Sequence, residues 1–314
     1  MRKVIDLCLD MPLSAKALAG MLNSMCLDPT YRGYKDTYGP GIAAQVGLTV
    51  PELEAVFASE GKEGFLKLVH EAAEKHAVTP SQFVKHMDEV GIEWGITCDG
   101  DHDNYKTAEI VHAHPDRLKG FIFLDPNQGM SAVRELEKCV KEYGLHALYL
   151  TAFRTKLPAN DKKNYPLYAK CCELGIPVHI YSSLNLSKAV PYDIGHPRYI
   201  DEVARDFPEL RIMAGVSGWP WVMEFIALAI RHENVYLNFE THSPAKIDMR
   251  GSGYENYLYY AEHQIKNRLC FASNWTTQST PVEEIIAQVE ALPFSDDTKE
   301  RILYHNAKAF YCEN

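Results

Sequence analysis

The chain has 314 residues, of which 46% are hydrophobic and 24% charged, an ordinary balance for a globular protein that buries a sizeable core. Its 32 basic and 42 acidic residues give a net charge of −10 without a basic stripe, so we expect no nucleic acid and no membrane among its partners. The 8 cysteines form no CxxC pair and the sequence shows no apolar leader, so we expect free thiols and a cytoplasmic location.

Short apolar runs alternate along the chain with segments whose apolar residues recur every three or four positions, such as SAVRELEKCVKEYG. The runs that predict strands are, in chain order, VIDLCLD, IEWGITCD, LKGFIFLD, LHALYLTA, PVHIYSS, LRIMAGV, VYLNFET and RLCFASN. This repeated alternation indicates an α/β fold, a (β/α)₈ TIM barrel that forms a single domain over residues 1–314. A doubly wound parallel sheet is the competing interpretation.

The second predicted strand begins only near residue 92, so residues 12–88 are longer than one crossover needs. Helical patterns cover VPELEAVFASEGKEGFLKLVHEAAEKH and TPSQFVKHMDEVG, whereas the Tyr- and Gly-rich GYKDTYGPG is expected to form a loop. We therefore predict an N-terminal helical insertion after the first strand. It acts either as a lid over the C-terminal mouth of the barrel or as a solubilising or dimerising element.

Phrases along nearly the whole chain resemble the amidohydrolase-related (amidohydrolase 2) family, which includes aminocarboxymuconate semialdehyde decarboxylase and the resorcylate-type decarboxylases. The phrases that carry the resemblance are VIDLCLDMP, GIEWGIT, HPDRLKGFIFLDP, NYPLYAKCCELGIPVHIYSS, HPRYIDEVARDFPELRIMAG, RLCFASNW and ILYHNAKAFY. The order and spacing of these phrases indicate the family more specifically than any single phrase does. The resemblance implies a TIM barrel that acts on a small cyclic or aromatic-derived compound.

The metal site of that family is where this sequence departs from the pattern. Cys8 and Asp10 stand in place of the His-x-His pair of the first strand, Tyr181 in place of the fifth-strand histidine, and Asn274 in place of the last-strand aspartate. A thiol, a carboxylate, a phenol and an amide are a poor ligand set for a divalent ion. We therefore predict no cofactor. The alternative is one zinc or manganese ion held by Cys8, Asp10 and His179.

Barrel active sites lie at the C-terminal ends of the strands, and this rule selects the candidate catalytic residues. Asp10 is the candidate general acid or base, because burial at the mouth raises a carboxyl pKa; the alternative is a structural carboxylate. His179 can also move a proton near neutrality, or it is a core histidine. Tyr181 and Asn274 are placed to hydrogen-bond a carbonyl or oxyanion, or they only fill the vacated metal site.

Further polar and aromatic side chains near strand ends are predicted to bind the substrate. Arg154 offers a two-pronged contact to a carboxylate, and tryptophans suit a planar ring, although an exposed arginine and core packing are the alternatives. The run CDGDHDN lacks the later residues of a calcium loop, so we interpret its aspartates as helix caps, with Asp99 near the site. The full predicted set is Cys8, Asp99, Tyr149, Arg154, Trp219, Glu240, His242 and Trp275.

These observations together predict a hydrolase that breaks a ring C–O, C–N or C–C bond by metal-independent acid/base catalysis. Asp10 and His179 would activate water or move protons, and Tyr181, Asn274 and Arg154 would bind the polarised carbonyl. A second hypothesis is non-oxidative decarboxylation of a cyclic or aromatic acid. A third is a non-catalytic barrel that binds a ligand. The partner expected in each case is a small molecule, and a homodimer is left open.

Overall fold

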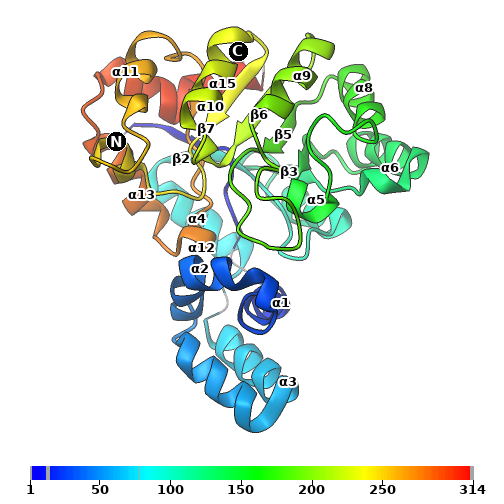
Figure 1. Ribbon diagram of the computed structural model, residues 1–314, viewed down its shortest axis with the longest axis vertical. Helices are drawn as coiled ribbons and strands as arrows, with labels where there is room; N and C mark the ends of the chain where they lie inside the picture. The colour runs from blue at the N-terminus through cyan, green and yellow to red at the C-terminus, as the bar shows by residue number, and fades with distance from the viewer. Residues whose placement is uncertain (1, 12–14, 77, 312–314) are drawn as a thin grey trace.

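A computed structural model describes the chain except for residues 1, 12–14, 77 and 312–314. In the described part, eight parallel strands pair in sequence order from β1 to β8 and curl into a barrel surrounded by helices (Figure 1). The TIM-barrel prediction is therefore confirmed. The strands are β1 Val4–Asp6, β2 Ile92–Thr97, β3 Leu118–Ile122, β4 Ala147–Leu150, β5 Val178–Tyr181, β6 Ile212–Gly215, β7 Val235–Asn238 and β8 Leu269–Cys270.

The segments that follow β1 and β8 meet and bring the two edges of the sheet together. The backbone N–H of Leu7 donates to the carbonyl oxygen of Phe271 over 3.1 Å. One carboxylate oxygen of the fully buried Asp6 accepts both the N–H of Cys8, at 3.0 Å, and the N–H of Ser273, at 2.8 Å. This side chain therefore bridges the first and last segments of the barrel.

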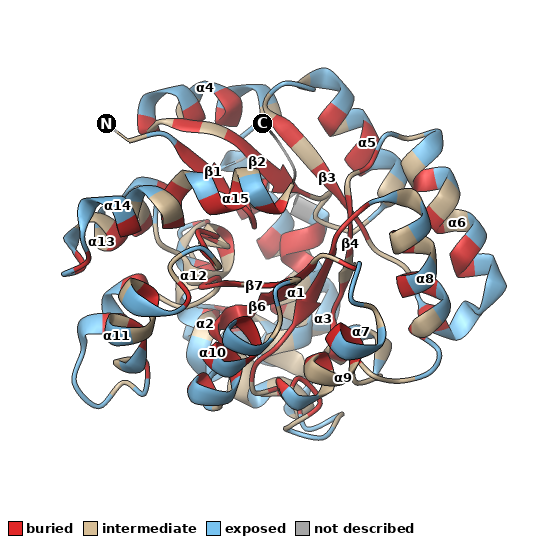
Figure 2. Ribbon diagram, turned by 90° about the horizontal axis from the view of Figure 1, so that it is seen from above, coloured by how far each residue is buried: buried red, intermediate tan, exposed pale blue. Residues whose placement is uncertain are grey.

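Helices cover the outside of the barrel and turn their buried residues towards the strands (Figure 2). In α6, for example, Ala132, Val133, Leu136 and Cys139 recur every three or four residues and are buried, as the amphipathic pattern predicts. The helices that follow β2 in the chain are α5 Asn104–Ala113, α6 Met130–Lys141, α7 Ala152–Thr155, α8 Tyr165–Leu174, α9 Arg198–Asp206, α10 Val222–Arg231, α11 Asn256–His263, α12 Trp275–Gln278, α13 Val282–Ala291, α14 Asp296–Glu300 and α15 Asn306–Phe310. No helix in the described residues is both long and apolar enough to cross a membrane.

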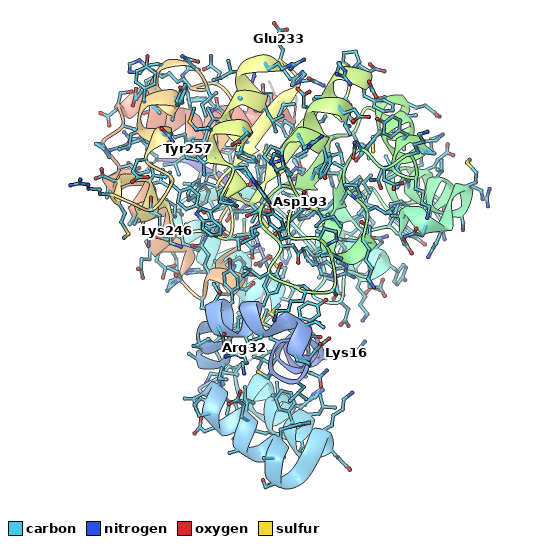
Figure 3. The ribbon with its side chains drawn as sticks, viewed as in Figure 1. Lys16, Arg32, Asp193, Glu233, Lys246 and Tyr257 are labelled. Atoms are coloured by element: carbon cyan, nitrogen blue, oxygen red, sulfur yellow. The ribbon has the colours of Figure 1, made fainter. Side chains whose placement is uncertain are left out.

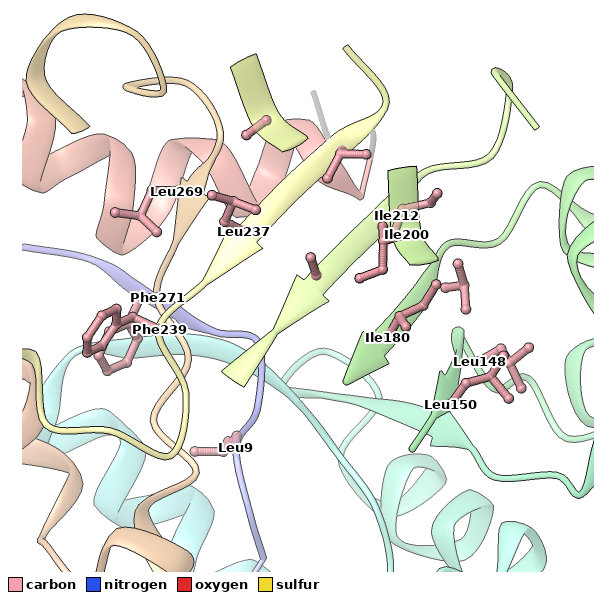
Figure 4. Close-up of a cluster of buried hydrophobic side chains, with 14 of the residues drawn as sticks. Leu9, Leu148, Leu150, Ile180, Ile200, Ile212, Leu237, Phe239, Leu269 and Phe271 are labelled. Atoms are coloured by element: carbon pink, nitrogen blue, oxygen red, sulfur yellow. The ribbon is translucent and has the colours of Figure 1, made fainter. Parts of the chain in front are cut away.

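Strand residues alternate between two apolar layers, because successive side chains point to opposite faces. Leu148, Ile180, Ile212 and Leu237 belong to the layer between the strands and the outer helices (Figure 4). A second set of buried residues fills the inside of the barrel: Ile5, Leu7, Cys8, Trp94, Ile96, Phe121, Ala147, Met213, Cys270, Ala272, Ala307 and Phe310. The barrel interior is thus packed below its mouth.

The insertion after β1 is helical, as predicted, and comprises α1 Ala15–Leu27, α2 Arg32–Ala44, α3 Val50–Lys75 and α4 Pro80–Val90. The first three form a lobe that projects beyond the barrel (Figure 1), with a separate core that includes Leu22, Ile42 and Phe65. Capping boxes at Thr49 and Thr79 begin α3 and α4, which agrees with the predicted helices.

The prediction that GYKDTYGPG forms a loop is wrong. This segment lies in α2, although that helix contains Pro40. Tyr34, Tyr38 and Ile42 are spaced by four residues and so share one face of the helix. Tyr38 and Ile42 pack in the core of the lobe, and this packing outweighs the turn propensity of the glycines.

We expect Asp6→Ala to lower the free energy of unfolding by about 2–4 kcal/mol, because two buried N–H groups lose their acceptor. Asp6→Asn keeps a carbonyl oxygen at the same place, so it should lose less than the alanine variant. Urea unfolding at neutral pH measures both differences. An alanine variant as stable as the wild type would show that this carboxylate does not hold the barrel ends together.

Candidate active site

A pocket of about 980 Å³ lies at the C-terminal ends of the barrel strands, between the barrel and the insertion. Segments after all eight strands line one side, and α1 and α2 line the other. Of the residues predicted from the sequence, the pocket is lined by Cys8, Asp10, Tyr149, Arg154, Tyr181, Trp219, His242 and Asn274. Residues far apart in the chain therefore converge on one site.

Asp10 is held at the pocket by two contacts from the segment after β8. Its Oδ2 accepts from the Thr276 hydroxyl at 2.5 Å, and its backbone oxygen accepts from the Trp275 indole at 2.8 Å. Burial raises the pKa of Asp10 to about 7; the Thr276 hydrogen bond opposes this, and the charges of Asp6 and Glu240 reinforce it. The carboxyl is thus poised to exchange a proton near neutral pH.

Tyr149 and Glu240 form a hydrogen-bonded pair at the inner end of the pocket. The Tyr149 hydroxyl donates to Glu240 Oε1 at 2.6 Å, and the Asn238 amide donates to Oε2 at 3.0 Å. Burial raises the pKa of Glu240, while hydrogen bonds from Tyr149 and Cys8 lower it. Burial and the nearby Glu240 charge raise the pKa of Tyr149 well above its usual value, so this phenol stays protonated. Glu240 itself is buried behind Tyr149 and does not line the pocket.

Arg154 lines the pocket in contact with His102, a residue that sequence reasoning did not select. Arg154 Nη1 donates to His102 Nδ1, and the His102 ring packs on Phe123 with centroids 4.1 Å apart. Burial and the Arg154 charge lower the pKa of His102 to about 4, so the imidazole is neutral and can accept. The histidine within CDGDHDN was the signal that could have indicated this contact. His102 therefore orients a cation at the pocket.

Lys246 is a second cation at the pocket, and sequence reasoning also missed it. It lies in η4, Pro244–Asp248, after β7 (Figure 3), whereas Arg154 follows β4. Burial and the nearby Lys246 charge lower the pKa of His242 to about 3, so this imidazole is neutral. Two cationic groups on segments that follow different strands suit a substrate with an anionic group.

Tyr181 and Asn274 line the pocket, but each already donates one hydrogen bond within the protein. The Tyr181 hydroxyl donates to the Leu184 carbonyl at 2.7 Å, and the Asn274 amide donates to the Thr241 hydroxyl at 2.8 Å. Asn274 keeps a second N–H on the same amide nitrogen, whereas a phenol has only one. Asn274 is therefore better suited than Tyr181 to donate to a substrate.

His179, Asp99 and Trp275 do not line the pocket. The His179 ring is buried among aromatic side chains inside the barrel, with Nε2 3.0 Å from the Tyr311 hydroxyl, and burial lowers its pKa to about 3. Asp99 accepts from the backbone N–H of Asp101 at 2.9 Å within the loop after β2. Trp275 stacks on a phenylalanine of α4. These three residues were selected because they lie near strand ends, and that position alone does not show which side chains surround them.

The family model described as Amidohydrolase matches residues 74–312. The chain belongs to this family. The resemblance seen in the sequence is therefore confirmed, and the match begins at the end of α3, so it includes the barrel from β2 onwards. No curated protein matched the sequence.

Several solved structures share the fold of this chain over nearly its full length. An uncharacterised TIM-barrel protein from Bordetella bronchiseptica has 23% identity and a TM-score of 0.70, with 99% of each chain covered. The 5-carboxyvanillate decarboxylase from Sphingomonas paucimobilis has 14% identity and a TM-score of 0.64, with 99% of each chain covered. A dihydroxybenzoic acid decarboxylase from Polaromonas has 16% identity and a TM-score of 0.59, with 99% of this chain and 97% of that chain covered.

The prediction that this chain uses no cofactor is contradicted, because the Polaromonas decarboxylase was solved with bound manganese and the inhibitor 2-nitroresorcinol. Substituted ligand positions are a weak argument against a metal, since water and substrate also supply donor atoms. The described side chains nevertheless fit a metal poorly: no three His, Cys, Asp or Glu among them converge to hold one. The alternative set is also divided, because Cys8 and Asp10 line the pocket and His179 does not.

We expect Arg154→Ala to weaken the binding of 2-hydroxybenzoate by roughly tenfold to a hundredfold, the range for losing a hydrogen bond to a charged group. His102→Ala should weaken it less, because the guanidinium remains but is no longer oriented. Calorimetric titration measures both affinities, with Arg198→Ala on the exposed side of α9 as the matched control. Unchanged binding in Arg154→Ala would rule out this residue as an anion ligand.

Proposed function

We propose that this amidohydrolase hydrolyses a ring C–O, C–N or C–C bond in a cyclic or aromatic-derived compound that carries a carboxylate. The observation that carries the proposal is Asp10, a carboxyl with a pKa of about 7 in a pocket that also contains two cationic side chains. A group with this pKa exchanges protons readily at neutral pH. The cations, Arg154 and Lys246, match a substrate with a negative charge.

Asp10 is the general base of the proposed reaction. Its carboxylate takes a proton from water, and the water oxygen attacks the carbonyl carbon, which is bonded to the ring oxygen, nitrogen or carbon that will leave. The electron pair moves onto the carbonyl oxygen and then returns as the ring bond breaks. Asp10 gives its proton to the leaving ring atom, so the carboxylate is regenerated.

Other side chains support this reaction without exchanging protons. The second N–H of Asn274 is available to donate to the carbonyl oxygen as negative charge develops on it. Arg154, oriented by His102, binds the substrate carboxylate, and the rings of Phe123, Phe153 and Tyr181 offer apolar faces to a planar ring. Positioning the ring in this way lowers the entropic part of the barrier.

Non-oxidative decarboxylation is the second candidate, and the protonated form of Asp10 supports it. Below a pH of about 7 the carboxyl carries a proton and can deliver it to a ring carbon as the bond to the carboxylate breaks and carbon dioxide leaves. Two of the similar solved structures are named as decarboxylases of ring acids. The two reactions use the same residue in opposite protonation states.

The pH dependence of turnover separates these candidates. For hydrolysis with Asp10 as base, the rate should rise as pH increases through about 7, because the carboxylate is the active form. For decarboxylation with Asp10 as acid, the rate should fall over the same range. The assay uses monocyclic lactones and 2-hydroxybenzoates in buffer with manganese, with ring-opened acid and carbon dioxide as the products measured.

Asp10→Asn should lower turnover by about a hundredfold to ten-thousandfold in either reaction, because the amide cannot exchange the proton. Asp36→Asn, an exposed carboxyl on α2, is the matched control and should turn over as the wild type does. If Asp10→Asn kept full activity, Asp10 would have no catalytic role. If no substrate turned over but ligands still bound, the barrel would be a binding protein.

A further inference from the structure

The pocket is larger than a single-ring acid requires. Its volume of about 980 Å³ lies at the upper end of the roughly 300–1,000 Å³ typical of pockets for drug-sized ligands. The groups assigned to the reaction, Asp10, Asn274 and Arg154, all lie on segments that follow barrel strands. The remainder of the pocket extends towards the insertion, where none of these groups lies.

The side of the pocket formed by the insertion is apolar. We call it the apolar chamber and define it by Met21 and Met25 of α1, Tyr34 and Tyr38 of α2, and Leu186 of the segment after β5. Methionine side chains are flexible and polarisable, and tyrosine rings present broad apolar faces, so such walls adapt to ligands of different shape.

Several polar groups beside the apolar chamber are already bonded within the protein. The Ser24 hydroxyl donates to the Gly20 carbonyl at 3.0 Å, and the Thr37 hydroxyl donates to the Gly33 carbonyl at 2.8 Å. Tyr34 is hydrogen-bonded to Tyr181 and to the backbone of Leu186. Because these three hydroxyl groups already have partners within the protein, they offer little to a polar ligand. An apolar group is the better match.

Gly20 shows that the space next to α1 is open. A Cβ atom added to Gly20 would meet no atom within 4 Å apart from its chain neighbours and its own helix backbone, and this exposed residue lines the pocket. Glycine inside a helix costs about 0.5–1 kcal/mol relative to alanine, and Gly20 has no positive φ that would require it. A small residue at this position keeps the apolar chamber wide.

We propose that the apolar chamber binds an extended apolar substituent of the substrate, so that the substrate class is a ring acid with an alkyl chain or a second ring. This inference rests on the proposed function for the position of the ring acid next to Asp10 and Arg154. It adds that most of the binding energy comes from the other end of the molecule, through burial of apolar surface between the barrel and the insertion.

Calorimetric titration with substituted 2-hydroxybenzoates tests the apolar chamber without requiring turnover. The ligands carry an ethyl, a pentyl, an octyl or a phenyl group. Affinity should rise roughly threefold for each buried methylene along the alkyl series, and the phenyl compound should bind more tightly than unsubstituted 2-hydroxybenzoate. If affinity rises only in the alkyl series, the substituent is an alkyl chain; if it rises only for the phenyl compound, the substituent is a ring. If affinity does not rise in the alkyl series and the phenyl compound binds no more tightly than 2-hydroxybenzoate, the inference is overturned.

Gly20→Leu places a leucine side chain in the apolar chamber and tests whether the alkyl group of the ligand binds there. It should lower the ratio of octyl to ethyl affinity at least tenfold, whereas Ala44→Leu, which adds similar bulk to an exposed site on α2 outside the pocket, should leave the ratio unchanged. Circular dichroism and urea unfolding check that both variants fold. A ratio equal to that of the wild type in Gly20→Leu would show that the chain binds elsewhere.

The outcomes for the apolar chamber and for Asp10 are independent. If Asp10→Asn loses turnover and the ligand series shows no gain, the proposed function stands and the apolar chamber is not a substituent site. If the ligand series shows the gain and Gly20→Leu removes it while Asp10→Asn keeps full activity, the apolar chamber stands and the catalytic role of Asp10 fails.

Discussion

The hydrogen bonds that Asp6 accepts across the barrel closure are the constraint on which the site depends. One partner, Cys8, lies after β1, and the other, Ser273, lies after β8. Asp10 follows the first segment and Thr276 the second, so the same closure brings the carboxyl to its hydroxyl partner. A buried carboxylate can accept from both segments at once, which an apolar side chain cannot do.

Burial sets the protonation of the groups around the pocket, and it acts in opposite directions on acids and bases. It raises the pKa of Asp10 to about 7 and lowers that of His102 to about 4, because it disfavours the charged form of each. The carboxyl is therefore able to exchange a proton near neutral pH. The imidazole remains neutral and accepts from Arg154, so one physical cause underlies both the proton transfer and the anion binding that we propose.

Much of the fold could be predicted because it depends on local patterns. The alternation of apolar runs with helical periodicity indicated the barrel, and capping residues marked α3 and α4. The helix α2 was missed because glycine and proline are typical of loops, and only its packing against the rest of the lobe outweighs that propensity. The prediction of no cofactor failed for a related reason: it judged the site from the residue types at the matched positions alone.

The sequence by itself determined the barrel, its helical insertion and the position of Asp10 at a strand end, because parallel strands bring their carboxyl ends to one mouth. Only the tertiary structure decided which strand-end groups share the pocket. His179 and Tyr181 lie two residues apart on β5, yet Tyr181 lines the pocket and His179 is packed inside the barrel. His102 beside Arg154 and the apolar chamber arise from contacts between distant segments, and no local pattern encodes such contacts.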